Sequence, residues 1–157
     1  MAVLIRNDHP QVNIDSEDIN KKFEVVMKSL GCLNQEVSIL LTIDADIRKL
    51  NQQFRNIDQA TDVLSFPQDA DEDPIIIPGE IILGDIAVSL DTAQAQAKEH
   101  GLTFEEEIIL LLIHGILHLL GYDHEISEQE DERMRIKTRE LFSLVFPEKT
   151  LADSCNY

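Results

Sequence analysis

Residues 107–124 of the chain read EIILLLIHGILHLLGYDH, a stretch that contains its longest apolar run. Thr103 and Glu106 stand just before it in the capping-box pattern that begins a helix, and Gly121 is a residue type that ends one. The helix predicted over 107–120 is apolar nearly all round, and a helix without a polar face is buried. We therefore expect this helix to lie largely inside the protein.

Three of the five histidines of the chain fall in the same stretch. His114 and His118 are four residues apart, so they project from nearly the same helical face, about 6 Å apart along the axis. Gly121 can fold the chain back in a left-handed conformation, which lets His124 approach as a third ligand. A shared cation removes the cost of burying unpartnered imidazoles, whereas a single core histidine is better explained by an ordinary hydrogen bond. The spacing predicts a metal site on His114, His118 and His124.

The histidine spacing resembles the H-E-x-x-H-x-x-G-x-x-H motif of zinc peptidases, except that Gly115 stands where those enzymes carry a glutamate. Three nitrogen ligands leave one tetrahedral position open, as in catalytic zinc sites, and lower the pKa of bound water toward about 7. Peptide hydrolysis also needs a group that carries the proton to the leaving amine. Gly115 therefore argues against a peptidase, unless a base comes from elsewhere, and favours cleavage of a phosphodiester by charge stabilisation.

A second group of polar residues occupies positions 55–67, RNIDQATDVLSFP, in a turn that leads into a predicted strand. Arg55 presents a planar fork of donors that suits a phosphate group. From spacing alone, capping or an ion pair with Asp58 or Asp62 is an equally good interpretation of Arg55.

The remaining apolar patterns predict the fold. Runs rich in β-branched residues predict strands at 3–5, 37–43, 62–66 and 80–88. Helices are predicted from a cap at Asp15 or Ser16 to Leu30, from a cap at Asp44 to about Phe54, from Ser89 to His100, from Glu107 to Leu120, and from Ser127 to a stop before Pro147. This order predicts an α+β fold with a small mixed sheet of about four strands, about five helices and the metal site on a buried helix.

Length and composition limit the class of protein. With 157 residues, 43% hydrophobic and 27% charged, we predict one globular domain over residues 1–157, with a flexible tail at 151–157 and a solvated acidic loop at 68–79. The start lacks the layout of a secretory signal, and the run 108–113 is far shorter than the roughly 18 residues that span a bilayer. We expect a cytoplasmic protein without a membrane partner or a disulfide framework.

Three motifs together resemble the bacterial YbeY family. They are R-x-x-D-x-x-T-D-V-L-S-F-P from Arg55, L-G-D-I-x-V-S at 83–89, and H-G-x-L-H-L-x-G-Y-D-H from His114. The resemblance implies an α+β endoribonuclease specific for single-stranded RNA, with zinc on His114, His118 and His124. It also implies ribosomal RNA maturation, notably at the 3′ end of the small-subunit RNA, and ribosome quality control. We accordingly predict Arg55, as the phosphate or RNA contact, and His114 as catalytic residues.

The same resemblance implies partners beyond RNA: the small ribosomal subunit, a small-subunit ribosomal protein and a ribosome-associated GTPase. The alternative function is a ribosome-assembly factor whose metal is structural and whose catalysis is slight. Asp85 or Asp123 is a candidate to orient a ligating histidine through its outer nitrogen, although Asp123 is as well suited to capping the turn.

The charge of the chain conflicts with RNA binding. Lys and Arg total 13 against 30 Asp and Glu, a net charge of −17, which repels polyanions. Local basic residues precede the arginine motif and follow the histidines: Arg48, Lys49 and Arg55, then Arg133, Arg135, Lys137 and Arg139. The second group alternates with acidic residues and is interpreted mainly as a solvated helix face. A partner such as the ribosome can supply part of the affinity.

Overall fold

The computed structural model describes residues 3–67, 81–123 and 125–151, which form four strands and five helices. In chain order the elements are β1 (Val3–Asn7), α1 (Ser16–Ser29), β2 (Gln35–Thr42), α2 (Asp44–Arg55), β3 (Val63–Pro67), β4 (Ile81–Ser89), α3 (Leu90–His100), α4 (Phe104–Leu119) and α5 (Glu128–Val145). The predicted order and the α+β class are confirmed. The predicted acidic loop at 68–79 and the tail beyond residue 151 lie outside the described residues.

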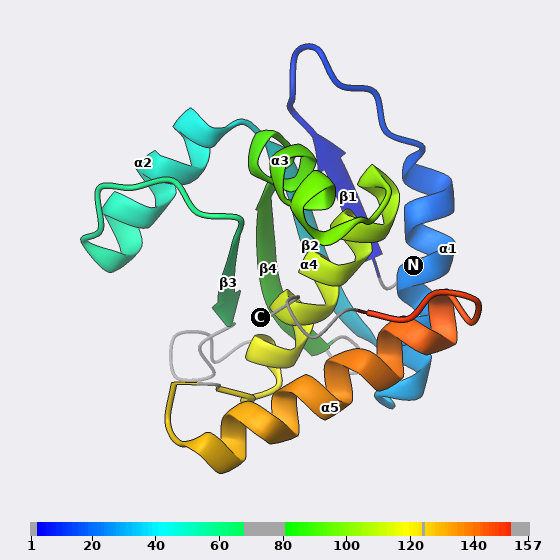
Figure 1. Ribbon diagram of the computed structural model, residues 1–157. Helices are drawn as coiled ribbons and strands as arrows, with labels where there is room; N and C mark the ends of the chain where they lie inside the picture. Colours follow the sequence, from blue (N-terminus) through cyan, green and yellow to red (C-terminus); the bar gives the residue numbers. More distant parts are fainter. Residues whose placement is uncertain (1–2, 68–80, 124, 152–157) are drawn as a thin grey trace.

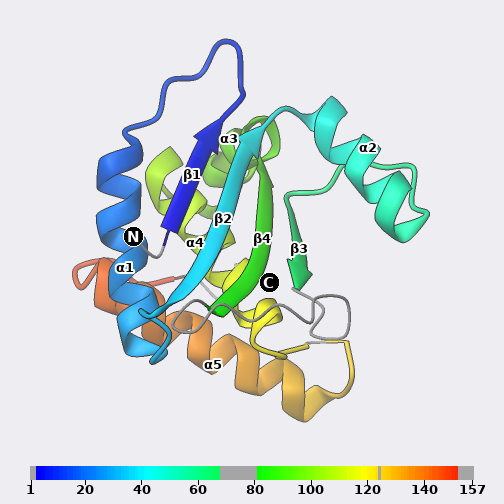
Figure 2. The same cartoon turned by 180° about the vertical axis from the view of Figure 1, so that it is seen from behind.

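The four strands form one mixed sheet in the order β1-β2-β4-β3. The β1–β2 and β2–β4 pairs are parallel, and the β3–β4 pair is antiparallel. Helices α1, α3, α4 and α5 lie on one face of this sheet (Figure 1). The view from behind shows the other face, with α2 beyond the edge formed by β3 (Figure 2).

Helix α4 lies at the centre of the covered face, in contact with β3, β4, α1, α3 and α5. The predicted capping box begins it: the Thr103 hydroxyl accepts from the Glu106 amide at 3.1 Å, and the Glu106 carboxylate accepts from the Thr103 amide at 2.8 Å. All side chains from 107 to 117 are buried. The prediction of a buried, nearly all-apolar helix is therefore confirmed.

Helix α2 lies at the β3 edge and packs against β3 and β4, on the side of the sheet opposite α4, through a smaller core of Ile47, Leu64 and Ala87. The prediction that Asp44 caps this helix is wrong, because Ile43 is the N-cap residue and makes no side-chain capping bond. The Asp44 carboxylate instead accepts hydrogen bonds from the hydroxyls of Ser89 and Thr92, the latter at 2.7 Å. These bonds join the start of α2 to the start of α3, a tertiary contact that outweighs the local capping preference.

Two further findings concern the start of the predicted tail and the length of the helices. Leu151, predicted to begin a flexible tail, is buried in the main core, and its carbonyl oxygen accepts from Nη1 of Arg139 at 3.4 Å. Leu151 is therefore packed against the core. Among the described residues, no helix has both the length and the apolar character needed to cross a bilayer.

Candidate metal and phosphate site

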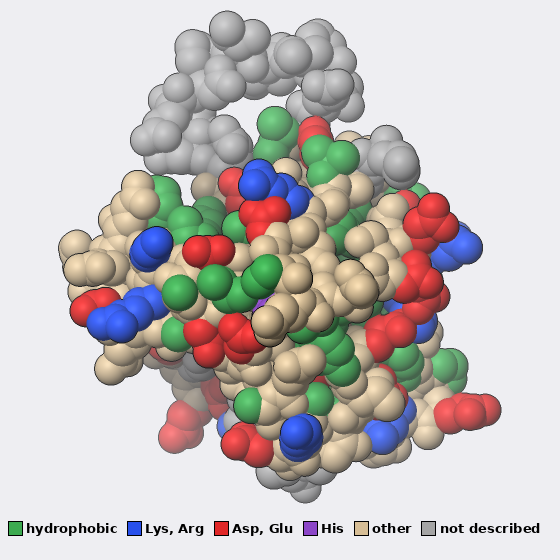
Figure 3. Space-filling view, turned by 90° about the horizontal axis from the view of Figure 1, so that it is seen from above, with side chains coloured by type: hydrophobic (Ala, Val, Ile, Leu, Met, Phe, Trp, Pro, Cys, Tyr) green, Lys and Arg blue, Asp and Glu red, His purple; other side chains and the backbone are tan. Residues whose placement is uncertain are grey.

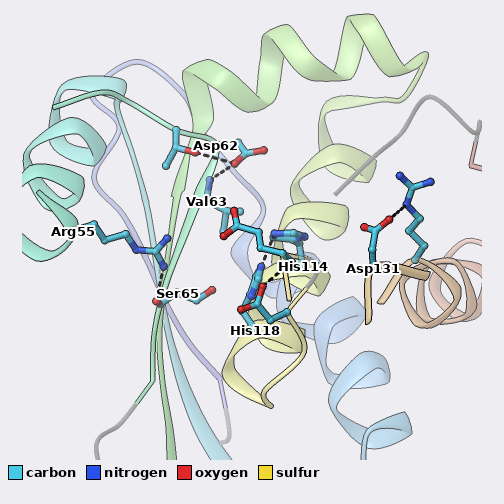
Figure 4. Close-up of a pocket in the computed structure, with 11 residues that line it drawn as sticks. Arg55, Asp62, Val63, Ser65, His114, His118 and Asp131 are labelled. Carbon is cyan, nitrogen blue, oxygen red and sulfur yellow. Dashed lines mark hydrogen bonds and ion pairs between the residues drawn. The ribbon is translucent and has the colours of Figure 1, made fainter. Parts of the chain in front are cut away.

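The final two turns of α4 carry His114 and His118, whose Nε2 atoms lie 2.9 Å apart. Their ring centroids are 4.5 Å apart with an interplanar angle of 74°, and the two rings turn toward one another (Figure 4). Two nitrogen ligands of a tetrahedral zinc ion lie roughly 3.3 Å apart when each is about 2.0–2.1 Å from the ion. A shift of a few tenths of an ångström separates the observed pair from that arrangement, so the donor types and their spacing fit a divalent metal ion.

The third predicted ligand, His124, lies outside the described residues. Its neighbours Asp123 and Glu125 line the same cavity as His114 and His118, so the described chain on both sides of position 124 is at the site. Over the described ranges, no group of three or more His, Cys, Asp or Glu side chains is arranged to hold a metal ion. The three-histidine ligand set therefore stays a prediction.

The turn after α4 forms as the sequence predicts. Gly121 has φ 96°, in the left-handed region that a side chain disfavours. Its amide donates to the carbonyl oxygen of His118 at 3.0 Å, and the amide of Tyr122 donates to that of Leu117 at 2.9 Å. These bonds end the helix directly after the second histidine and redirect the chain.

Arg55 is the last residue of α2, and its Nη2 donates to the backbone carbonyl oxygen of Ser65 at 3.3 Å. Neither aspartate proposed as its ion-pair partner binds it. Asp58 accepts from Arg48 at 2.6 and 3.0 Å, and the hydrogen bond from Arg48 lowers the pKa of Asp58. Asp62 accepts from the amide of Val63, the hydroxyl of Thr61 and the amide side chain of Gln96. The ion-pair interpretation of Arg55 is therefore wrong.

The histidines and Arg55 line one cavity of about 630 Å³ between α4, β3 and α5 (Figure 4). Its charged lining residues are the guanidinium groups of Arg55 and Arg135 and the carboxylates of Asp62, Asp123, Glu125 and Asp131. Four carboxylates against two guanidinium groups give this lining an excess of negative charge. Such a cavity attracts a cation and accepts a phosphate only where a cation or a guanidinium group offsets the carboxylates.

Gly115, the position of the missing glutamate, faces the sheet. A Cβ atom at this position would lie 2.8 Å from Cγ2 of Ile86, a fully buried residue of β4. The hydroxyl of Ser65 donates to the carbonyl oxygen of Gly115 at 3.0 Å, which ties β3 to α4 at the same level. A glutamate at position 115 would therefore point toward the core, and Ile86 or the helix would have to shift to accommodate it.

The structure places Asp123 and Asp85, the two candidates to orient a ligating histidine, in two different hollows. Asp123 lines the cavity, and its Oδ1 accepts from the amide of Glu125 at 2.9 Å, which is the turn-capping interpretation. Asp85 lines a separate hollow on the face of the sheet opposite α4. Among the site residues that sequence reasoning missed are Ser65, whose carbonyl oxygen accepts from Arg55, and Arg135, which was assigned to a solvated helix face.

Acidic and basic side chains are intermingled on the surface of the described residues that Figure 3 shows. Several cations are paired on the surface: Arg6 with Asp8, Arg48 with Asp58, and Arg133 with Glu130. The described residues therefore show no extended basic face in this view that would offset the net charge of −17 for RNA binding.

The fold and the site together define an α+β protein in which a histidine pair of a buried helix and an arginine of a neighbouring helix share one cavity. The family model described as "Endoribonuclease YbeY" matches residues 4–145. The chain belongs to this family, which confirms the resemblance found in its motifs.

Individual relatives support the assignment over most of the chain. A protein of Persephonella marina named endoribonuclease YbeY is 46% identical over 140 residues, which cover 89% of this chain and 90% of the relative. An Aquifex aeolicus protein of the same name is 43% identical, with 85% and 84% of the two chains covered. A Thermotoga maritima protein whose structure was solved in solution superposes with a TM-score of 0.61 at 33% identity, over 93% of this chain and 90% of that one.

Proposed function

We propose that the protein is a metal-dependent endoribonuclease that cleaves single-stranded RNA, with zinc held by His114, His118 and His124. The observation that carries the proposal is the convergence of the Nε2 atoms of His114 and His118, 2.9 Å apart, in the cavity that Arg55 also lines. The relatives named endoribonuclease YbeY support RNA cleavage as the activity.

The histidine pair and Gly115 of α4 have different roles at this site. Helix α4 is buried along most of its length, which fixes the two imidazole rings on one face. A divalent ion, when bound there, supplies Lewis-acid chemistry that withdraws negative charge from a phosphoryl oxygen and makes water more acidic. Since position 115 carries glycine and therefore no glutamate base, the site is suited to a reaction in which stabilising charge on oxygen is the main requirement.

Arg55 supplies the phosphate contact. The carbonyl oxygen of Ser65 accepts from Nη2 and so fixes the guanidinium plane at the cavity wall. The remaining donors of the planar fork match two oxygens of a phosphodiester in a bidentate arrangement. Charge that develops on these oxygens during cleavage is stabilised without reorganisation of the side chain.

We further propose ribosomal RNA as the substrate, notably the 3′ end of the small-subunit RNA, and therefore a cytoplasmic location. The small ribosomal subunit, one of its proteins and a ribosome-associated GTPase are the proposed partners. The assembly-factor alternative is not favoured, because the relatives carry the name of an endonuclease.

The test uses purified, metal-loaded protein and an end-labelled RNA with one single-stranded and one duplex segment. We expect cleavage in the single-stranded segment, and His114→Ala purified in the same way should lose at least about 100-fold in rate and release the metal. Its circular-dichroism spectrum should stay close to that of the wild type. Retained cleavage by a metal-free variant would overturn the proposal, and a 2′,3′-cyclic phosphate end would identify the 2′-hydroxyl of the RNA as the nucleophile.

A further inference from the structure

A second guanidinium group lines the cavity from the side opposite Arg55. Arg135 belongs to α5, and its Nε lies 3.1 Å from Oδ2 of Asp131, another lining residue. In Figure 4 the histidine pair lies between Arg55 and Asp131, so the two arginine-bearing elements flank the candidate metal site. The side chain of Arg135 is 45% exposed, which leaves it accessible to a ligand in the cavity.

Arg135 differs from the other cations of α5 in its surroundings. Arg133 pairs with Glu130 at 3.2 Å and lies over the ring of Tyr122, 4.3 Å from its centroid. Lys137 pairs with Glu140, and Arg139 donates to a backbone carbonyl oxygen. Of the cationic side chains, all of which fall within the described ranges, Arg55 and Arg135 are the two that line this cavity.

The ion pair with Asp131 orients Arg135 and leaves most of its donors available. Asp131 forms an ion pair with Nε, and within the described part of the chain no hydrogen bond of the two Nη groups is found. These groups form the end of a planar fork that suits a phosphate. In a cavity lined by four carboxylates, each guanidinium group that meets a phosphate offsets a repulsion that would otherwise oppose the RNA.

The size of the cavity supports more than one phosphate contact. Its volume of about 630 Å³ lies in the range of pockets that enclose whole small-molecule ligands, and it greatly exceeds the volume of one phosphate group. A strand that places one phosphate on Arg55 and crosses the histidine pair leaves the cavity on the side of α5.

We propose that Arg135 binds a second phosphate of the RNA backbone, on the other side of the histidine pair from the phosphate held by Arg55, with Asp131 as its positioning residue. The strand then runs from α2 across the histidine pair to α5, and two arginines on different elements set its direction. This inference rests on the proposed endoribonuclease function and adds an RNA contact to it.

The test compares Arg135→Gln with Arg133→Gln, which removes the same charge from the same helix two residues away. The probe is a single-stranded 2′-O-methyl oligoribonucleotide with phosphorothioate linkages, which resists cleavage. Its affinity for metal-loaded protein is measured by fluorescence anisotropy over a range of potassium chloride concentrations. The logarithm of the affinity falls linearly with the logarithm of the salt concentration. Loss of one phosphate contact reduces the magnitude of this negative slope by about 0.7.

We expect this reduced slope and about a 3- to 10-fold weaker affinity at low salt for Arg135→Gln, and a slope close to that of the wild type for Arg133→Gln. Arg135→Lys, which keeps the charge, should restore the slope. Equal slopes for the two glutamine variants, beside a wild type that cleaves single-stranded RNA, would overturn this inference alone. A wild type that neither binds nor cleaves RNA would overturn the proposed function itself.

Discussion

Gly115 of α4 and Ile86 of β4 are in such close contact that a Cβ atom on the glycine would lie 2.8 Å from Cγ2 of the isoleucine. Both residues are buried, and Ile86 is a β-branched residue held in a strand, so it has little freedom to move aside. The contact brings the helix axis close to the sheet directly beside His114. The same glycine that removes a peptidase-like base therefore positions the histidine helix.

Gly115→Ala tests this contact. Alanine gains about 1 kcal/mol from helix propensity but meets an overpacking cost of about 1–3 kcal/mol, so we expect a net loss of stability of up to about 2 kcal/mol. Urea unfolding measures it. Ala95→Gly, at an exposed position of α3, measures the propensity contribution without packing and should cost about 1 kcal/mol. If Gly115→Ala were more stable than the wild type, α4 would not be packed tightly against β4 at this position.

Arg55→Gln tests the phosphate contact, with Arg48→Gln on the same helix as its control. We expect kcat/KM for single-stranded RNA to fall by about 100-fold for Arg55→Gln, since a donor to a developing negative charge is lost. Arg48 pairs with Asp58 and does not line the cavity of the histidines, so its variant should stay within about 3-fold of the wild type. Similar losses in both variants would indicate a general effect of charge on α2.

Metal removal should be visible in thermal stability as well as in activity. An ion at about 100 times its Kd stabilises the folded state by about 2.7 kcal/mol, or about 5–10 °C in Tm for a chain of this size. Differential scanning calorimetry of chelator-treated protein, with and without added zinc, measures this shift. His118→Ala should abolish the shift, whereas Arg55→Gln, which keeps the histidines, should retain it. A shift that survives in His118→Ala would place the metal elsewhere.

The element order and the buried helix were predictable because their signals are local. The capping box of Thr103 and Glu106 and the left-handed turn at Gly121 depend on residues within one or two helical turns, and both are present in the structure. The role of Asp44 was not predictable in this way, since its partners Ser89 and Thr92 follow 45 and 48 residues later. Local propensity predicted that Asp44 caps α2, but its carboxylate accepts tertiary hydrogen bonds instead.

The candidate site shows the same limit. The sequence spacing could not distinguish an ion pair from a phosphate contact for Arg55. The two candidate aspartates bind other residues: Asp58 accepts from Arg48, ten residues away, and Asp62 accepts from Gln96, 34 residues away. The position of Arg135 in the cavity was not predicted, because basic and acidic residues alternate along this helix. A signal was present, however: Asp131 and Arg135 form an i,i+4 pair beside the buried Met134 and Thr138, at the boundary where a helix face meets the protein.

A final prediction concerns the link between His9 and Asp91, whose Nε2 and Oδ1 atoms lie 2.7 Å apart. The hydrogen bond from His9, followed by one from the amide of Asp44, lowers the pKa of Asp91 below its ordinary value of 3.8. A carboxylate with a lowered folded-state pKa stabilises the protein above its unfolded-state pKa, and this contribution is lost as the pH falls through the folded-state value.

Asp91→Asn should therefore lower the urea midpoint at about pH 5, by a modest amount because the carboxylate is partly exposed, and the difference from the wild type should shrink toward about pH 2.5. Glu99→Gln, at an exposed position of the same helix, should show no comparable difference. At low pH the carboxyl group of Asp91 is protonated in the folded and the unfolded state, so its charge no longer contributes to stability. A difference in urea midpoint between wild type and Asp91→Asn that stays constant or widens on acidification would therefore contradict the lowered pKa of Asp91.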